Sequence, residues 1–418
     1  MAEIRKSEGF VDWLDQRLAV KAFMRVMMTE YWIPKNINFL WAMGVVLVVL
    51  FGVLLVTGLL LLMYYKPDIN LAFDSVNYTI MQEVEYGWLW RHMHGVAASA
   101  TFLIIYIHLF TGIYYGSYKK GREMIWITGM VLFIAFSAEA FSGYMLPWGQ
   151  MSYWAAQVIT NLFSGIPVIG DDVVIWIRGD YVVADATLTR FFMLHVVLLP
   201  LVIIVVIAVH FYSLRFPHVN NQESEEFNFD IEARKFLEGR KKESKVVPFW
   251  PVFLSKDFFV VGFFMTFFFV LVCYNFDFAM DPINFEPANS MKTPAHIYPE
   301  WYFLWNYEVL RGFFFDIGGI AAMDIGLIAF VIANMVFFVL PFLDRNPMNT
   351  APAHKRPLFK YWFWILVVDM IVLTVYGKLP PTGVNAWVGF YAAVVFLGLF
   401  MALPFITKHE ARHQGDNQ

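Results

Sequence analysis

Four histidines lie at matched positions in two apolar segments of the chain. His94 and His108 are 14 residues apart, and His195 and His210 are 15 residues apart. On an α-helix, at ~1.5 Å and ~100° per residue, each pair lies ~21–22 Å apart and within ~60° of one face. If the two helices are parallel and these faces meet, His94 lies opposite His195 and His108 opposite His210. Two facing imidazoles with no Cys, Asp or Glu beside them suit the two axial positions of a haem iron. The spacing therefore predicts two haem irons, one above the other across a membrane.

Glycines in two other apolar segments repeat this period. Gly44 and Gly58 are 14 residues apart, and so are Gly129 and Gly143. A glycine has no side chain, so a flat macrocycle can approach the backbone there. Taken alone, the histidines could be packing or hydrogen-bonding groups, and the glycines could serve close helix–helix packing. Because the glycine step of 14 residues repeats that of His94 and His108, we predict that each haem leans on a glycine at its own depth.

Two arginines precede the histidines expected near the outer surface. Arg91 lies three residues before His94, and Arg190 lies five residues before His195. A guanidinium group binds a carboxylate through two parallel hydrogen bonds, so either arginine could pair with the propionates of the outer haem. The alternative is that both anchor helices at the membrane edge.

The composition is that of a protein that spans lipid. Hydrophobic residues make up 59% of the chain and charged residues 15%, against about 25% charged residues in soluble domains. The mean hydropathy is +0.57. The one cysteine, Cys273, allows neither an internal disulfide nor a Cys-based metal site, and no Cys-x-x-Cys-His segment is present for covalent haem attachment. We predict an all-α polytopic membrane protein with two non-covalent b-type haems.

Eight segments have the roughly 20 apolar residues that a transmembrane helix needs. We predict that the first four, within residues 39–214, form a bundle that holds both haems, and that residues 258–407 form a second region of four spans. Residues 1–38 would be a cytoplasmic amphipathic segment, 215–257 a cytoplasmic loop and 408–418 a polar tail. The predicted spans are Phe39–Tyr64, Gly95–Tyr115, Met124–Leu146, Phe191–Leu214, Phe258–Phe276, Ile320–Leu343, Phe359–Tyr376 and Ala386–Thr407.

The basic residues orient these spans. Of the 30 Lys and Arg residues, 22 lie on the side that holds both termini and five lie in the loops of the other side. Such an excess predicts that both termini are cytoplasmic. The long basic amino terminus and the extended loop before the fifth span favour a bacterial inner membrane over a mitochondrial one. Residues 11–32 mix apolar and charged side chains, which predicts an amphipathic helix on the membrane surface.

Two motifs resemble one known family. Pro-Glu-Trp-Tyr at residues 299–302 resembles the outer quinol-site signature of the cytochrome b subunit of quinol-oxidising cytochrome bc complexes. Residues 143–152, Gly-Tyr-Met-Leu-Pro-Trp-Gly-Gln-Met-Ser, are similar to the end of that family's third span. The resemblance extends over about residues 31–379, with all eight spans in the order of the family.

The resemblance implies a catalytic subunit of quinol–cytochrome c reductase. Such a subunit oxidises quinol at an outer site and passes electrons through the two b haems to a quinone at an inner site, with coupled proton translocation. The expected partners are a Rieske iron–sulfur protein, a c-type cytochrome subunit, a second copy of the complex, quinol and quinone, and lipid, with no nucleic acid. Ubiquinone and menaquinone both remain open as the substrate.

The resemblance also implies roles for four side chains. Glu300 matches the family's proton-accepting glutamate, and Tyr307 matches its quinol-site tyrosine. Lys256 and Asp257 match the Lys-Asp pair of the quinone-reduction site, where both can supply protons. From the residues alone, Pro-Glu-Trp-Tyr could be a surface turn, and the Lys-Asp pair could simply begin a helix at the membrane interface.

Some residues depart from the family pattern or stand out within a span. Arg215 and Thr111 stand where many members have, respectively, a quinone-contacting histidine and an arginine near the inner haem, which leaves the inner-site contacts open. Glu139 is ionisable and lies inside the third span, where such residues are functional by default. It could belong to a proton route near the outer haem or have a hydrogen-bonded structural role. The other histidines are expected in loops or at span edges: His92, His218, His296, His354, His409 and His413.

Two other classes of protein fit part of the pattern. A dihaem membrane anchor of a different quinone-linked dehydrogenase needs the four histidines but not Pro-Glu-Trp-Tyr. A transporter could line a substrate path with the histidines and Glu139, and it would lack a b-type haem spectrum.

Overall fold

The structure is a computed structural model that describes residues 9–119, 121–278, 280–346 and 351–415. Within these residues, eight helical segments are long and apolar enough to cross a membrane. The predicted all-helical fold with eight spans is therefore confirmed. The segments are Phe39–Leu62, Gly87–Tyr114, Glu123–Met145, Asp185–Leu214, Phe249–Tyr274, Ala322–Leu343, Pro357–Lys378 and Val384–His413.

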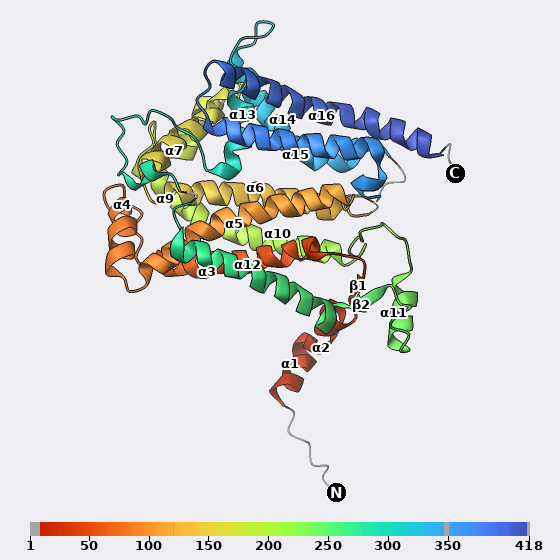
Figure 1. The fold of residues 1–418 in the computed structure, drawn as a ribbon. Helices are drawn as coiled ribbons and strands as arrows, with labels where there is room; N and C mark the ends of the chain where they lie inside the picture. The colour runs from red at the N-terminus through yellow and green to blue at the C-terminus, as the bar shows by residue number, and fades with distance from the viewer. Residues whose placement is uncertain (1–8, 120, 279, 347–350, 416–418) are drawn as a thin grey trace.

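Figure 1 shows how the helices and strands follow one another. The α-helices are α1 (Phe10–Leu18), α2 (Val20–Met24), α3 (Met43–Leu62), α4 (Ala72–Asp74), α5 (Gly87–Tyr114), α6 (Glu123–Met145), α7 (Gln150–Leu162), α8 (Gly170–Arg178), α9 (Asp185–Met193), α10 (Leu199–Leu214), α11 (Phe229–Leu237), α12 (Leu254–Tyr274), α13 (Leu304–Arg311), α14 (Ala322–Leu343), α15 (Pro357–Lys378) and α16 (Val384–Gly415). The 3₁₀ and π turns are η1 (Arg25–Thr29), η2 (Phe39–Ala42), η3 (Ser75–Glu83), η4 (Phe163–Gly165), η5 (Leu194–Leu198), η6 (Phe249–Phe253), η7 (Pro282–Phe285), η8 (Trp301–Phe303) and η9 (Ala353–Lys355). The strands are β1 (Trp32–Pro34) and β2 (Val246–Pro248).

The spans are helical because lipid offers no partners to backbone N–H and C=O groups. A helix pairs these groups within one segment. In α3, for example, Thr57 is the one residue with a polar side chain, and its hydroxyl donates to the carbonyl of Val53 in the preceding turn (2.7 Å). The helix therefore presents almost no polar group to its surroundings.

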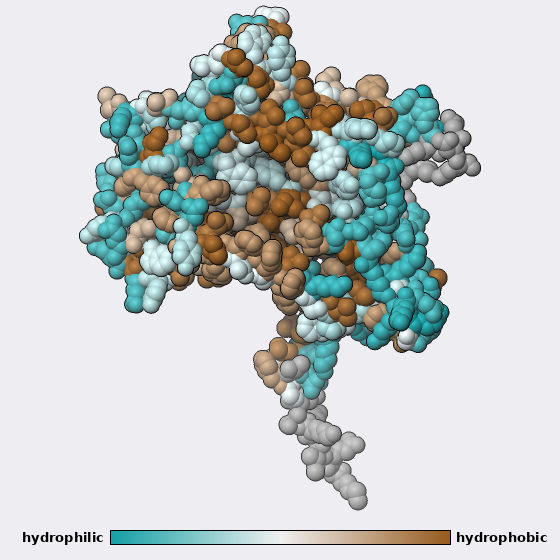
Figure 2. All heavy atoms as spheres, in the orientation of Figure 1, coloured by the Kyte–Doolittle hydropathy of each residue, from teal (hydrophilic) through white to brown (hydrophobic). Residues whose placement is uncertain are grey.

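The long helices pack in two groups. In the first group, α3 and α12 pack on α5, and α6 packs on α10. In the second group, α15 packs on α13 and α16, and α14 packs on α13. Figure 1 shows α4, α7 and α9 at one end of the bundle, with β1, β2 and α11 at the other end. In Figure 2, hydrophilic residues gather at these two ends and hydrophobic residues cover much of the surface between them, as expected for a membrane-spanning bundle.

The amino-terminal segment differs from the prediction of one amphipathic helix over residues 11–32. Helix α1 ends at Leu18, the next residue, Ala19, has a φ of 47° in the left-handed region, and α2 begins after it. This conformation is unfavourable for residues other than glycine and interrupts the helix. Further on, β1 pairs antiparallel with β2, with Ile33 opposite Val247. The pairing joins the amino-terminal segment to the loop before α12.

The carboxyl-terminal helix is longer than predicted, because α16 continues to Gly415 where a polar tail was expected from residue 408. Arg356 explains the extension. Its fully buried guanidinium bonds both carboxylate oxygens of Asp344 (2.8 and 3.0 Å) and one oxygen of Glu410 (2.9 Å). Asp344 follows α14, Arg356 precedes α15 and Glu410 lies in α16, so this cluster joins the ends of three helices.

Candidate functional site

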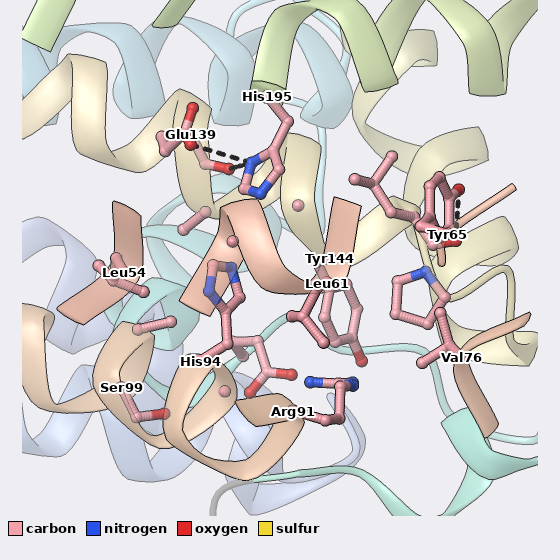
Figure 3. Close-up of a pocket in the computed structure, with 18 of the residues that line it drawn as sticks. Leu54, Leu61, Tyr65, Val76, Arg91, His94, Ser99, Glu139, Tyr144 and His195 are labelled. Atoms are coloured by element: carbon pink, nitrogen blue, oxygen red, sulfur yellow. Dashed lines mark hydrogen bonds and ion pairs between the residues drawn. The ribbon is translucent and has the colours of Figure 1, made fainter. Parts of the chain in front are cut away.

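Two imidazoles face each other across a large cavity in the first helical group. His94 on α5 and His195 on η5 have ring centroids 6.1 Å apart and ring planes at 83°. Figure 3 shows the two rings on opposite sides of the cavity. The cavity has about 1740 Å³ free of protein atoms, part of it open to the outside. A metal ion with imidazole bonds of about 2 Å on each side fits between the rings.

Hydrogen bonds fix which nitrogen of each ring faces the cavity. Nδ1 of His94 lies 2.9 Å from Oγ1 of Thr57, which gives its own hydrogen to Val53 and therefore accepts from the ring. Nδ1 of His195 lies 3.0 Å from the carbonyl oxygen of Glu139, which can only accept. In both rings Nδ1 thus holds the hydrogen and Nε2 keeps a free lone pair, which is the form that binds a metal. The residues present fit an iron with two axial imidazoles.

The second pair repeats this arrangement toward the other end of the same helices. His108 on α5 and His210 on α10 are close enough to interact electrostatically. Nδ1 of His210 lies 3.0 Å from Oγ1 of Thr128, whose hydrogen goes to the Met124 carbonyl (2.7 Å). The structure therefore brings the four predicted ligands together in two pairs, His94 with His195 and His108 with His210.

A π turn aligns the two histidines of the fourth span. Such a turn holds one residue more than an α-helical turn. The π turn η5 begins at Leu194, directly before His195. On uninterrupted α-helices, steps of 14 and 15 residues would differ in direction by ~100°. The extra residue of η5 removes this difference, so His195 and His210 can face His94 and His108.

Each of the four predicted glycines lies against one ligand. A Cβ on Gly44 would be 3.8 Å from His108, an ordinary contact, whereas a Cβ on Gly143 would overlap the ring of His195. The glycines therefore make room for the four imidazole rings. The pairs are Gly44 with His108, Gly58 with His94, Gly129 with His210 and Gly143 with His195.

Comparison with known proteins agrees with this arrangement. Residues 28–217 match the family described as Cytochrome b/b6/petB, and residues 287–397 match the family described as Cytochrome b(C-terminal)/b6/petD. The chain belongs to the cytochrome b family. Members of this family hold two non-covalent b haems and act on quinones, so this chain is a redox protein of quinol-linked electron transfer.

The matches extend over nearly the whole chain. Cytochrome b of Rickettsia conorii is 39% identical over 407 residues, which cover 97% of this chain and 96% of that protein. Cytochrome b of Rhodobacter capsulatus is 39% identical over 416 residues, which cover 96% of this chain and 92% of that protein. A chain of a solved structure described as a hyperthermophilic respiratory Complex III matches with a TM-score of 0.86 and 38% identity, over 96% of this chain and 100% of that chain.

Glu300 lines the same cavity as the outer histidine pair. Tyr144 and Arg91 line it as well. Burial, with the nearby charge of Asp281, raises the pKa of the Glu300 carboxyl to about 8, against the opposing effects of a hydrogen bond from Tyr144 and the charge of Arg91. A group with such a pKa can take up and release protons near neutral pH.

Aromatic contacts hold the Glu300 loop against α5. Tyr302 stacks on Phe102 with ring centroids 4.1 Å apart, and its main-chain carbonyl accepts a hydrogen bond from Tyr106 (2.5 Å). Tyr106 in turn accepts a hydrogen bond from Trp305 (2.8 Å). These contacts join residues from the two halves of the sequence and fix Glu300 at the cavity wall.

The other predicted outer-site residues have different surroundings. Arg91 lines the cavity, as Figure 3 shows. Arg190 is exposed and donates to the carbonyl of Trp176. Tyr307 donates its hydroxyl to the carbonyl of Ile297 (3.1 Å), so it stabilises the loop that precedes Glu300.

The predicted inner-site residues lie near the opposite end. Lys256 and Asp257 both lie in the first turn of α12, where Lys256 is exposed and Asp257 is buried. The guanidinium of Arg215 lies 4.0 Å from the centre of the Tyr31 ring, and its Nε and Nη1 are buried without hydrogen-bond partners among the described residues. Thr111 donates its hydroxyl hydrogen to the main-chain carbonyl of Ile107 in its own helix (2.7 Å).

The sequence analysis missed the threonines that orient two ligand rings. Thr57 and Thr128 each directly precede one of the predicted glycines, so a Thr-Gly pair repeated in two spans was the available signal. Three histidines predicted in loops or at span edges lie in helices near span ends. His92 is buried near the start of α5 and stacks on Phe276, and His409 and His413 lie in the last turns of α16.

Proposed function

We propose that this protein is the quinol-oxidising subunit of a quinol–cytochrome c reductase. It oxidises quinol at an outer site, reduces quinone at an inner site and couples both reactions to proton translocation. The relatives named cytochrome b and the matching chain of a respiratory Complex III support this assignment. Its partners are a Rieske iron–sulfur protein, a c-type cytochrome subunit and a second copy of the complex.

The main support is that Glu300 and the outer histidine pair line one cavity. A quinol in this cavity meets a proton acceptor and lies next to the outer ligand pair. Glu300 accepts a quinol proton as a carboxylate, and the hydroxyl of Tyr144 stabilises that carboxylate by its hydrogen bond. When bound, the two haems supply a one-electron path between the outer and inner sites.

The proposed ligands follow from the two histidine pairs. His94 and His195 bind the outer haem, and His108 and His210 bind the inner haem, with Gly44, Gly58, Gly129 and Gly143 leaving room for the rings. Arg91 binds a propionate of the outer haem from the cavity wall. Arg190 can do the same after it leaves the carbonyl of Trp176.

At the inner site, Lys256 and Asp257 supply protons to the quinone. The unpaired N–H groups of Arg215 suit a quinone carbonyl, in place of the histidine expected from the family. Ubiquinone and menaquinone each carry two ring carbonyl groups, so both quinones are compatible with these residues.

We place the protein in a bacterial inner membrane with both termini in the cytoplasm. The excess of Lys and Arg on the side of the termini supports this orientation. In Figure 1, the carboxyl-terminal end of α16 lies at the same end of the bundle as β1, β2 and α11, which fits an even number of spans.

A dihaem anchor of another dehydrogenase is less well supported. It would need the histidine pairs but not a partly buried glutamate in the same cavity. The match of residues 287–397 to the carboxyl-terminal family also favours the reductase.

Haem content and reduced-minus-oxidised spectra of the purified complex test the proposal. We expect two b haems per chain in the wild type, loss of one haem in His94→Ala and loss of the other haem in His108→Ala. A wild type without two b haems would contradict the proposal. Loss of the same haem in both variants would contradict the assigned pairs.

A further inference from the structure

The hydrogen-bond partners of the ligand rings differ in chemistry. The partners of His94 and His210 are the neutral hydroxyl groups of Thr57 and Thr128. Nδ1 of His195 instead lies 3.0 Å from the carbonyl oxygen of Glu139 and 3.1 Å from Oε1 of the same residue's side chain. Figure 3 shows both contacts as dashed lines to one ring. A carboxyl group therefore contacts a ligand of the outer haem.

The surroundings of this carboxyl group make the ring its main partner. Its second oxygen, Oε2, is buried without a hydrogen-bond partner among the described residues. The side chains of Glu139 and His195 are each 17% exposed, so water has little access to the contact. A buried charge is costly unless it is paired and hydrogen-bonded. Nδ1 of His195 hydrogen-bonds the Glu139 main-chain carbonyl and also lies within ion-pair distance of Oε1 (3.1 Å), so the ring is the polar group that the structure places beside this carboxyl group.

We propose that the carboxylate of Glu139, which lies 3.1 Å from Nδ1 of His195, lowers the reduction potential of the outer haem. The inference rests on the ligation of the outer haem by His195 that is proposed above. A carboxylate partner makes a metal-bound imidazole a stronger electron donor. Its negative charge also favours the more positive, oxidised iron in a medium of low dielectric constant. A lower outer potential favours electron transfer from the outer haem to the inner haem. Quinone reduction at the inner site requires transfer in this direction.

Glu139 acts through His195, so it is a positioning residue. This role differs from a proton route, because no proton has to leave the Glu139–His195 contact. It also differs from a purely structural role, because removing the charge should change the outer potential while both haems stay bound.

Redox titration of the purified complex at one fixed pH tests the proposal. Glu139→Gln keeps the size of the side chain and an acceptor oxygen but removes the charge. We expect both haems to remain and the outer potential to rise by at least 59 mV, which is a tenfold change in the equilibrium constant of a one-electron couple. Glu139→Thr, which introduces the hydroxyl found beside His94 and His210, should shift the outer potential in the same direction.

Two variants serve as controls. Asp369→Asn removes another carboxyl group that is buried and has an oxygen without a hydrogen-bond partner among the described residues. Asp369 lies on α15 and is not among the residues that line the cavity of His94 and His195, so this variant should leave both potentials unchanged. Thr128→Val removes the neutral partner of His210 and should raise the potential of the inner haem alone.

An unchanged outer potential in Glu139→Gln, or an equal shift of both haems, would overturn the proposal. Loss of the outer haem from both Glu139 variants would also overturn it, because Glu139 would then be needed for haem retention. A different result would show that the proposed ligation of the outer haem by His195 is wrong. In that case the wild type would lack two b haems, or His195→Ala would keep the outer haem.

Discussion

At the scale of single residues, the carboxyl group of Glu300 links proton transfer to the outer cavity. Because its pKa is raised to about 8, mainly by burial, the group is mostly protonated at lower pH and cannot accept a quinol proton. Above that pH it is mostly a carboxylate and can accept one. The rate of quinol oxidation should therefore rise as the pH increases through about 8.

Glu300→Gln should abolish this rise and lower the rate of quinol oxidation by ~10²-fold, the typical contribution of an acid–base group. The measurement is reduction of cytochrome c by a soluble quinol between about pH 6 and pH 9. Glu286→Gln is the matched control, because this carboxyl group lies in the same outer region, is exposed and pairs with Lys292. An unchanged pH profile in Glu300→Gln would exclude Glu300 as the proton acceptor.

The glycines beside the ligands predict a graded response to an added methyl group. Gly143→Ala should lose the outer haem, because its Cβ would overlap the ring of His195. Gly44→Ala should keep the inner haem, because its Cβ would lie 3.8 Å from His108. Gly52→Ala, with nothing within 4 Å of the added Cβ, is the neutral control. Haem content per chain measures all three, and equal retention in Gly143→Ala and Gly52→Ala would contradict the prediction.

At the scale of helices, the π turn η5 sets the direction of the outer ligand in the fourth span. Deleting Val197 within η5 should convert the π turn to an α-helical turn and keep both haems. Deleting Leu103 in α5 shortens the separation of His94 and His108 by one residue, and α5 has no π turn that could become an α-helical turn. The directions of the two rings should then differ by a further ~100°, and one haem should be lost. Both deleted side chains are partly exposed, 39% for Val197 and 47% for Leu103, which makes the deletions comparable. Haem spectra of the two variants provide the test, and equal haem loss in both would count against this role of η5.

The helices also show which features a sequence can reveal. Apolar runs predicted the eight spans because backbone groups in lipid must pair within a helix. The start of α5 at Gly87 was missed because Arg91 and His92 reduce local hydropathy although the helix includes them. The extension of α16 was missed because Glu410 is polar by itself and becomes a buried partner of Arg356 only in the folded chain.

At the scale of the whole molecule, the outer cavity joins groups that are far apart in the sequence. His94 and His195 come from the first helical group, whereas Glu300 comes from the loop before α13. Histidine spacing predicted the ligands, and the family resemblance implied a role for Glu300. Their presence in one cavity depends on contacts between the two halves, such as the hydrogen bond from Tyr106 to Tyr302. The contact between Glu139 and His195 depends in the same way on the packing of two helices.

The orientation of the whole molecule can be tested with cysteines, because Cys273 is the one cysteine in the sequence. In a Cys273→Ser background, Met291→Cys lies in the proposed outer region, where the side chain of Met291 is 92% exposed. Lys242→Cys lies in an exposed turn of the proposed cytoplasmic loop. A maleimide that cannot cross the inner membrane should label Met291→Cys in spheroplasts and Lys242→Cys only in inverted vesicles. The reverse pattern would contradict cytoplasmic termini, because the excess of basic residues near Lys242 would then lie on the side that such residues disfavour.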